Sequence, residues 1–198
     1  MDQPLSIDEI EARIVGPDDM LSEGRRLARR AIELGNAGEH IVCADLIIQG
    51  HRAYQASQGL PYDIVADCDG ELFCIAVKST SRAVVRPERE NKRVVYNFSV
   101  GRSKRDNTGK TDSRGYTSAD VDIVAFCALN LRLVAYIHLS ECGRSVHFEP
   151  PNTPTPPKQN VRGLLKWKER KTFEFYTFER ALQVHRREIP PLKIKGRE

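Results

Sequence analysis

The spacing of apolar residues changes once along the chain, from a helical period to an alternating one. Before residue 50, the three- and four-residue spacing predicts a short acidic helix that opens at Ser6, a second helix over about 19–34 and a third over about 37–49. We expect Gly35-Asn36 to separate the last two helices. We expect Gly50 to end the third, because glycine readily adopts the left-handed conformation that follows many helix ends.

Beyond residue 50, apolar and polar residues alternate, which predicts a series of strands. These lie at about 52–56, 62–67, 72–79, 93–100, 121–128, 132–139 and 144–148. The polar segment 101–118 is predicted to be a loop or a flexible excursion. Five prolines within 150–157 indicate a stiff linker, and a further helix is expected near 177–187.

This order of elements, with helices first, strands next and a helix later, predicts a mixed α/β domain. We divide the chain into an N-terminal helical extension (1–35), a core (36–149) and a proline-rich linker with a basic C-terminal appendage (150–198). With 198 residues, 40% of them hydrophobic, the chain can bury a core, which excludes disorder throughout.

Composition also indicates the cellular compartment in which the protein is expected. No stretch approaches the roughly 20 uninterrupted apolar residues of a membrane helix, and the N-terminus lacks the pattern of a signal peptide. The five cysteines form no C-x-x-C pair, so neither a disulfide framework nor a zinc knuckle is indicated. We therefore expect a cytoplasmic protein with no membrane partner.

The net charge of +4 is unevenly distributed. Residues 1–24 hold seven acids against one base, whereas 82–114 hold ten bases against four acids and 158–198 twelve against five. Such basic stretches suit a polyanionic partner such as nucleic acid, and a solvated surface is the alternative explanation.

A hairpin brings three residues to one face of the sheet. Asp69-Gly70 stands between two strand-like runs and predicts a two-residue turn, which sets Cys68 opposite Glu71. Counting outward, Asp63 lies opposite Ala76, and Lys78 is diagonal to Asp63 on the same face. A carboxylate and an ammonium are thereby placed together.

A second carboxylate precedes this hairpin. Glu39 is expected in the first turn of the third helix, where its charge complements the helix dipole, and on an apolar stripe with Val42, Cys43 and Leu46 that should face the sheet. The simpler interpretation is that Asp63 and Lys78 form a cross-strand ion pair and that Glu39 is only an N-terminal helix acid.

Together these residues resemble the PD-(D/E)XK nuclease superfamily. The resemblance rests on Gly38-Glu39 opening a helix, Pro61-Tyr62-Asp63 at the start of a strand, and Val77-Lys78-Ser79-Thr80 at the end of its hairpin partner. Within this superfamily, the sequence is most similar to small single-domain members, including a homing-endonuclease branch that carries Gln-x-Lys in the motif. The resemblance implies a restriction-endonuclease-like mixed β-sheet flanked by helices.

The resemblance also implies the chemistry. Members hydrolyse phosphodiesters with a divalent metal, for which Mg²⁺ is expected, with Mn²⁺ as a substitute. Asp63 would be the main metal ligand, Glu39 would bind a second ion or its water, and the carbonyl of Val77 would complete the coordination. Lys78 would position the attacking water and stabilise negative charge.

One position departs from the family pattern. Ala76 stands where members carry Glu or Gln, and its methyl group cannot bind a metal ion. Three explanations remain open: a natural loss of activity, a site that works with Glu39 and Asp63 alone, or an engineered substitution, which an isolated alanine in an otherwise intact pattern favours. A weakly active or inactive chain is expected.

The expected substrate is double-stranded DNA, bound by a homodimer or homotetramer because cutting both strands requires two sites. The residues expected to contact DNA are Ser79, Thr80, Arg102, Lys104, Arg105, Lys110 and Arg114. Asp120 and Asp122, at the entry of a later strand, are weaker candidates for the site. Two rivals are an inactive nuclease fold that serves as a nucleic-acid-binding or interaction module, and a small α/β protein with no role in nucleic-acid binding.

Overall fold

A computed structural model describes most of the chain and divides it into two compact units, Met1–Glu33 and Leu34–Glu198. The described residues are 23–87, 92–105, 111–151, 153 and 171–188. The predicted helix at Ser6, most of the proline-rich linker and Lys110 lie outside them. The described part of the first unit is helical and carries an exposed ion pair between Arg29 Nε and Glu33 Oε1, 3.2 Å apart.

The long helix corrects one prediction. Helix α2 (Glu23–Ile48) passes through Gly35-Asn36 without a break. Neither residue forbids helical geometry, and the cost of about 1 kcal/mol for the glycine is small beside the alanine-, leucine- and glutamate-rich segments on both sides. Glu39 therefore lies inside a helix rather than in a first turn, so no helix dipole favours its charge.

The second unit is built around a five-stranded mixed sheet with the order β1-β2-β3-β8-β9. Its strands are β1 (Arg52–Gln55), β2 (Ile64–Cys68), β3 (Glu71–Thr80), β8 (Ile123–Ala128) and β9 (Leu133–His138). Strands β3 and β8 are parallel, and the other neighbours are antiparallel. The predicted mixed α/β class is confirmed.

The β2–β3 hairpin has the register that the sequence predicts. Cys68 pairs with Glu71, and the ladder ends where Ile64 pairs with Ile75. Asp69 and Gly70 have φ angles of 58° and 88°, the positive values that a two-residue hairpin turn requires at both centres. The turn thus sets which residues of the two strands share a face.

Two smaller sheets accompany the main one. The three-stranded sheet has the order β10-β5-β4, with β4 (Val84–Pro87), β5 (Lys92–Ser99) and β10 (Ser145–Phe148). The two-stranded sheet consists of β6 (Arg102–Arg105) and β7 (Thr111–Arg114). It corrects the prediction of a loop over 101–118. An alternation of apolar residues indicates a strand with one buried face, whereas strands can pair through their backbones without any apolar side chains.

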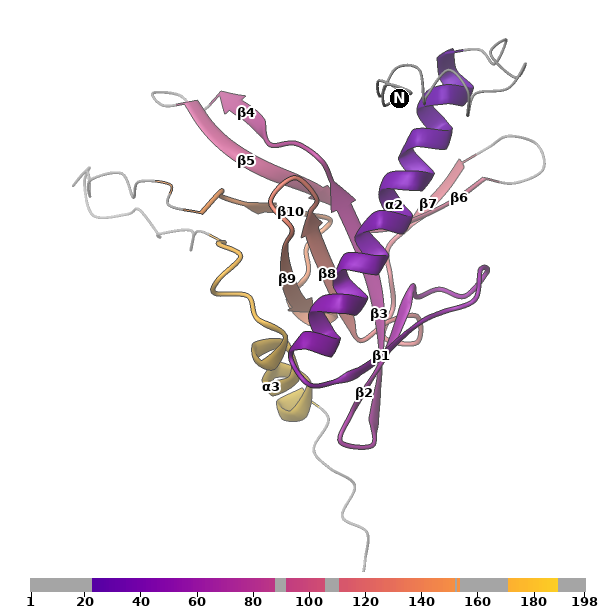
Figure 1. The fold of residues 1–198 in the computed structure, drawn as a ribbon, viewed down its shortest axis with the longest axis vertical. Helices are drawn as coiled ribbons and strands as arrows, with labels where there is room; N and C mark the ends of the chain where they lie inside the picture. The colour runs from indigo at the N-terminus through magenta and orange to yellow at the C-terminus, as the bar shows by residue number, and fades with distance from the viewer. Residues whose placement is uncertain (1–22, 88–91, 106–110, 152, 154–170, 189–198) are drawn as a thin grey trace, which may run out of the picture. The chain divides into compact units, whose positions relative to one another are not determined.

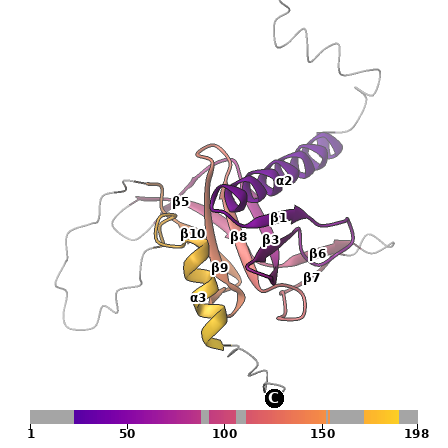
Figure 2. The same cartoon turned by 60° about the horizontal axis from the view of Figure 1, so that its bottom comes forward.

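The main sheet is covered on both faces. On one face, Val42 and Leu46 of α2 pack with Phe178 and Leu182 of α3 (Phe178–Glu188). On the other face, a second apolar cluster joins β3, β8 and β9 to the three-stranded sheet through Phe126, Phe148 and other aromatic side chains. Figures 1 and 2 both show α3 beside β9. Residue alternation in β3 therefore decides which layer each of its side chains meets.

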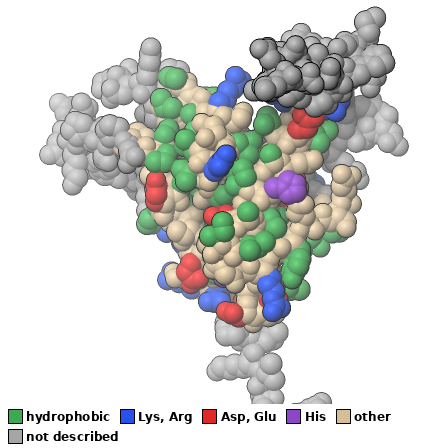
Figure 3. Space-filling view, in the orientation of Figure 1, with side chains coloured by type: hydrophobic (Ala, Val, Ile, Leu, Met, Phe, Trp, Pro, Cys, Tyr) green, Lys and Arg blue, Asp and Glu red, His purple; other side chains and the backbone are tan. Residues whose placement is uncertain are grey.

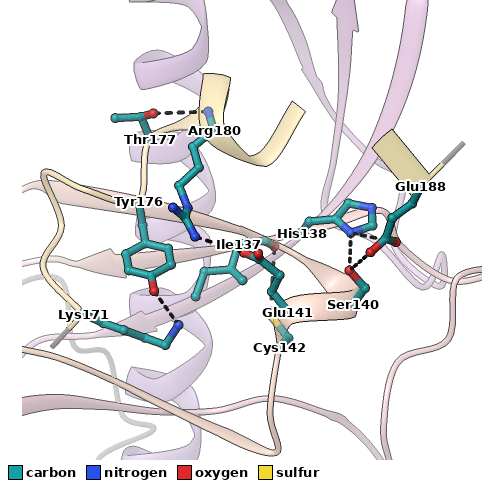
Figure 4. Close-up of polar contacts among 10 residues, drawn as sticks. All are labelled: Ile137, His138, Ser140, Glu141, Cys142, Lys171, Tyr176, Thr177, Arg180 and Glu188. Carbon is teal, nitrogen blue, oxygen red and sulfur yellow. Dashed lines mark hydrogen bonds and ion pairs between the residues drawn. The ribbon is translucent and has the colours of Figure 1, made fainter. Parts of the chain in front are cut away.

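Residues 171–188 pack into this core. The N–H of Tyr136 in β9 donates to the carbonyl oxygen of Tyr176 over 2.7 Å, just before α3. The Ser140 hydroxyl, in the 3₁₀ helix η2 (Leu139–Glu141), donates to Glu188 Oε1 over 2.6 Å (Figure 4). The predicted helix near 177–187 is confirmed by α3.

Large apolar side chains remain exposed on several elements of the second unit, including Ile48, Tyr54 and Leu72. On the face drawn in Figure 3, apolar side chains are interspersed with charged ones. In the described ranges, neither helix combines the length and the apolar content that crossing a bilayer requires.

Candidate active site

Asp63 stands one residue before β2, just beyond the last paired residues of the hairpin ladder. Its N–H donates to the carbonyl oxygen of Ile75 over 2.9 Å, and its Oδ2 accepts the N–H of Val77 over 2.7 Å. The side chain thus takes the place that a backbone carbonyl would occupy in a longer strand. These two contacts lie on either side of Ala76 along β3, while Asp63 itself stands outside the paired residues of the ladder.

Asp63 lies close enough to Glu39 to affect the ionisation of the Glu39 carboxyl. Burial raises the pKa of Glu39, and the negative charge of Asp63 raises it further, while the neighbouring His40 lowers it. The structure therefore brings together two carboxylates from a helix and a strand that are 24 positions apart in the sequence. Like charges that repel in this way favour binding of a cation between them.

A close contact between α2 and β3 sets the position of Glu39. An ideal Cβ added to Gly38 would overlap Ser79 Oγ and lie 2.8 Å from Ser79 Cβ. Only glycine permits this approach of the helix to the strand. Glu39, the next residue along, is thereby held beside the end of β3.

Lys78 follows Val77 and lies on the opposite face of β3, the face that Ala76 occupies. Its Nζ lies 5.0 Å from the centroid of the Tyr116 ring. Lys78 is half-buried, and its partner in the parallel ladder is Phe126 of β8. The ammonium is thus held over an aromatic ring on the face that carries Ala76.

Ala76 is fully buried, with 0% of its surface exposed, in the cluster between the two larger sheets. Its methyl group supplies no ligand. Among the described residues, no group of three or more His, Cys, Asp or Glu side chains could hold a metal ion. The third ligand of the family pattern is therefore missing from this arrangement.

The remaining donors still suit a hard divalent cation. Mg²⁺ binds through one or two carboxylates and keeps several waters, so Glu39 and Asp63 satisfy its minimum requirement. The N–H and C=O of a strand residue point to the same edge, and the N–H of Val77 points to Asp63. The Val77 carbonyl is therefore directed to the same side and can add a third oxygen.

Ser79 and Thr80 occupy different settings at the end of β3. Ser79 Oγ is buried against α2 and has no hydrogen-bond partner among the described residues. Ser79 is therefore a packing residue between the helix and the strand. Thr80 is half-exposed, and its hydroxyl donates to the carbonyl oxygen of Arg82 over 3.3 Å.

The predicted DNA-contacting bases fall on the β6–β7 hairpin. Arg102, Lys104 and Arg105 belong to β6, and Lys110 lies outside the described residues. Arg114, at the end of β7, is exposed, and its guanidinium lies 3.5 Å from Asp120 Oδ1. The hairpin is thus tied at its base to the segment that leads into β8.

Two residues matter more to this end of the sheet than the sequence indicated. Asp122 Oδ2 accepts the N–H of Cys74 over 2.8 Å, so β3 is flanked by an aspartate on each side. Asp122 therefore supports strand pairing, and its hydrogen bond was unpredictable because β3 and β8 are distant in sequence. The second residue is Tyr116, whose ring lies beside the Lys78 ammonium, and no local signal in the sequence links these two residues.

One comparison with known proteins identifies a family. A family model described as PD-(D/E)XK endonuclease matches residues 31–168. A solved structure, described as that of a bacterial homing endonuclease, I-Ssp6803I, matches with 17% identity and a TM-score of 0.46. The match covers 65% of this chain and 81% of that chain. No match is found among curated proteins.

Proposed function

The chain belongs to the PD-(D/E)XK endonuclease family, and we propose that it hydrolyses phosphodiester bonds of double-stranded DNA with Mg²⁺, for which Mn²⁺ can substitute. The observation that supports this proposal most is the electrostatic proximity of Glu39 and Asp63. Two carboxylates that raise each other's energy are stabilised by a divalent cation. The family generally uses such ions.

Each residue of the site has a role in this proposal. Asp63 and Glu39 bind the ion through their carboxylates, and the Val77 carbonyl adds a neutral oxygen. When bound, the ion neutralises charge that develops on the phosphate and makes hydroxide available near neutral pH. Lys78 orients the attacking water and stabilises the negative charge of the phosphate in the transition state.

Ala76 limits the rate in this proposal. It leaves the ion with fewer protein ligands, so we expect this chain to cleave weakly or not at all. The burial of Ala76 also means that a longer polar side chain at this position would need an ion to compensate its desolvation.

Metal binding can be tested without any cleavage assay. We expect Mg²⁺ or Mn²⁺ to raise the Tm of the protein by about 2 °C or more when added to the EDTA-treated sample. Glu39→Gln and Asp63→Asn keep the size of each side chain and should abolish the rise. An equal rise in both variants would mean that the ion binds elsewhere.

Cleavage is tested by restoring the family residue. We expect Ala76→Glu or Ala76→Gln to produce plasmid nicking or cutting in Mg²⁺ or Mn²⁺, and the additional substitution Lys78→Ala to abolish it. Ala76→Met is the matched control, because it adds similar volume without a metal-binding oxygen. Activity in the methionine variant would contradict the ligand role of this position.

The second candidate function is a nuclease-fold protein that binds nucleic acid or a partner without cutting. The full burial of Ala76 and the absence of a three-ligand group among the described residues favour it. No cleavage by the restored variants with any metal would support this candidate. For the nuclease, and for the second candidate if it binds nucleic acid, DNA affinity should fall steeply with added salt, and substitution of Arg102, Lys104 and Arg105 should flatten that dependence.

We also propose that two or four copies assemble, because a duplex cut needs a site for each strand. Light scattering after gel filtration tests this assembly. A monomer on DNA at saturating protein would restrict the proposed reaction to nicking.

A further inference from the structure

The ring of Tyr116 holds the Lys78 ammonium. The Lys78 Nζ lies 5.0 Å from the ring centroid, inside the distance of about 6 Å over which an aromatic face attracts a cation. Tyr116 is itself half-buried and packs against the apolar cluster that contains Ala76. The ring is therefore supported by the core while it contacts the ammonium.

The backbone beside Tyr116 is held by a closed turn. Asp120 Oδ2 accepts both the N–H of Thr117 over 2.9 Å and its hydroxyl over 2.7 Å. The N–H of Asp120 returns a hydrogen bond to the carbonyl oxygen of Thr117 over 2.9 Å. Asp120 also pairs with Arg114. Tyr116 thus stands between two residues that one carboxylate ties together, and its backbone has little freedom.

We propose that Tyr116 is a positioning residue that orients the Lys78 ammonium for the hydrolysis reaction. This inference rests on the proposed function of Lys78. A free lysine side chain samples many rotamers, and an aromatic face restricts that sampling. The ring attracts the ammonium without neutralising it, so the full positive charge remains available to the phosphate, which a carboxylate partner would reduce.

The contact itself can be measured in the protein as it exists. Reductive methylation with ¹³C-formaldehyde labels each lysine with methyl groups on Nζ, and the Lys78 signal is assigned by its loss in Lys78→Arg. We expect this signal to be displaced upfield by the ring current of Tyr116. Tyr116→Leu should return it to the range of the other lysines, whereas Tyr116→Phe, which keeps the ring, should preserve the displacement.

Tyr54 supplies the matched control, because it is an exposed tyrosine on β1. Tyr54→Leu should leave the Lys78 signal unchanged. A Lys78 signal that lies among those of the other lysines in the unsubstituted protein would overturn the proposal. So would a displaced signal that Tyr116→Leu leaves in place.

The effect on hydrolysis is measured in the Ala76→Glu background. We expect Tyr116→Leu to slow single-turnover cleavage by about tenfold, the size of losing one partly desolvated cation–π contact, with DNA affinity unchanged. Tyr116→Phe should remain within about twofold of its parent, because it retains the ring. Retained cleavage in Tyr116→Phe would show that the ring itself orients Lys78. Circular dichroism of both variants checks that neither substitution disrupts folding.

Two other outcomes distinguish the possible failures. A loss of DNA affinity in Tyr116→Leu with an unchanged cleavage rate would make Tyr116 a DNA contact and overturn the positioning role. No cleavage in any background, with the displaced Lys78 signal present, would overturn the proposed hydrolysis while supporting the hold of Tyr116 on Lys78.

Discussion

Gly38 in α2 lies against Ser79 in β3 so closely that no side chain fits between the helix and the strand. This contact links the two elements that carry Glu39 and Lys78. Helix α2 must approach β3 at Gly38 so that the carboxylate of Glu39, the next residue, can reach Asp63. The glycine is thus a requirement of the site as well as of the packing.

We predict that Gly38→Ala lowers the free energy of unfolding by about 1–3 kcal/mol, because a Cβ would overlap Ser79 and force the helix away. Gly35→Ala, in the same helix, is the matched control. Nothing lies within 4 Å of a Cβ there, so this substitution should stabilise the protein by about 0.5–1 kcal/mol. Urea unfolding measures both.

The two alanine substitutions should therefore have opposite signs. Gly38→Ala combined with Ser79→Gly should recover part of the loss, because the second change removes the atoms that the new methyl group meets. Equal stabilisation by both single substitutions would show that helix and strand do not approach as closely as described.

The second prediction concerns the pH dependence of stability at the acid pair. Because the pKa of Glu39 is raised in the folded state, that state binds more protons than the unfolded chain as the pH rises above 4.5. The contribution of Glu39 to stability therefore falls as the pH increases through this window. In EDTA, Glu39→Gln should be at least as stable as its parent at pH 7.5, and this advantage should shrink towards pH 4.5.

Urea unfolding from pH 4.5 to 8 checks this prediction, and Glu179→Gln is a suitable control because Glu179 lies in the first turn of α3. There the helix dipole favours the negative charge, so glutamine should cost a few tenths of a kcal/mol. If Glu39→Gln lost stability at neutral pH in the same way, the Glu39 carboxylate would not be in an unfavourable environment.

The third prediction concerns a buried histidine pair that joins β9 to α3. His138 Nε2 lies 3.2 Å from His185 Nδ1, and its Nδ1 lies 2.9 Å from Ser140 Oγ. Burial lowers the pKa of His138 below 6.5; the carboxylate of Glu188 opposes this effect, and electrostatic interaction with His185 adds to it. Protonation of His138 is therefore easier in the unfolded chain.

It follows that stability should decrease as the pH falls below about 6.5, by at most about 1.4 kcal/mol per pH unit for one proton. His138→Gln should flatten this dependence between pH 5 and 7 in urea unfolding experiments. An unchanged slope in the variant would assign the acid sensitivity to other groups.

Local rules explain how much of the site the sequence alone revealed. A two-residue turn at Asp69-Gly70 and the alternation of side chains set the β2–β3 register. They therefore place Lys78 on the face of β3 that carries Ala76, and they put Asp63 just beyond the end of the paired ladder. The family pattern could be recognised for the same reason, since its acid and lysine belong to one hairpin whose geometry depends on a few neighbouring residues.

Tertiary structure decided the rest, because the deciding contacts join segments that are distant along the chain. Helix α2 continues past Gly35 because the small free-energy cost of one glycine is outweighed by the stability of the rest of the helix. The spacing of apolar residues does not show this balance. The approach of Gly38 to Ser79, and of Tyr116 to Lys78, exists only once the helix and the later loop have packed against β3. The sequence thus identified the residues that could carry the chemistry. Only the tertiary structure showed the contacts that hold them in place.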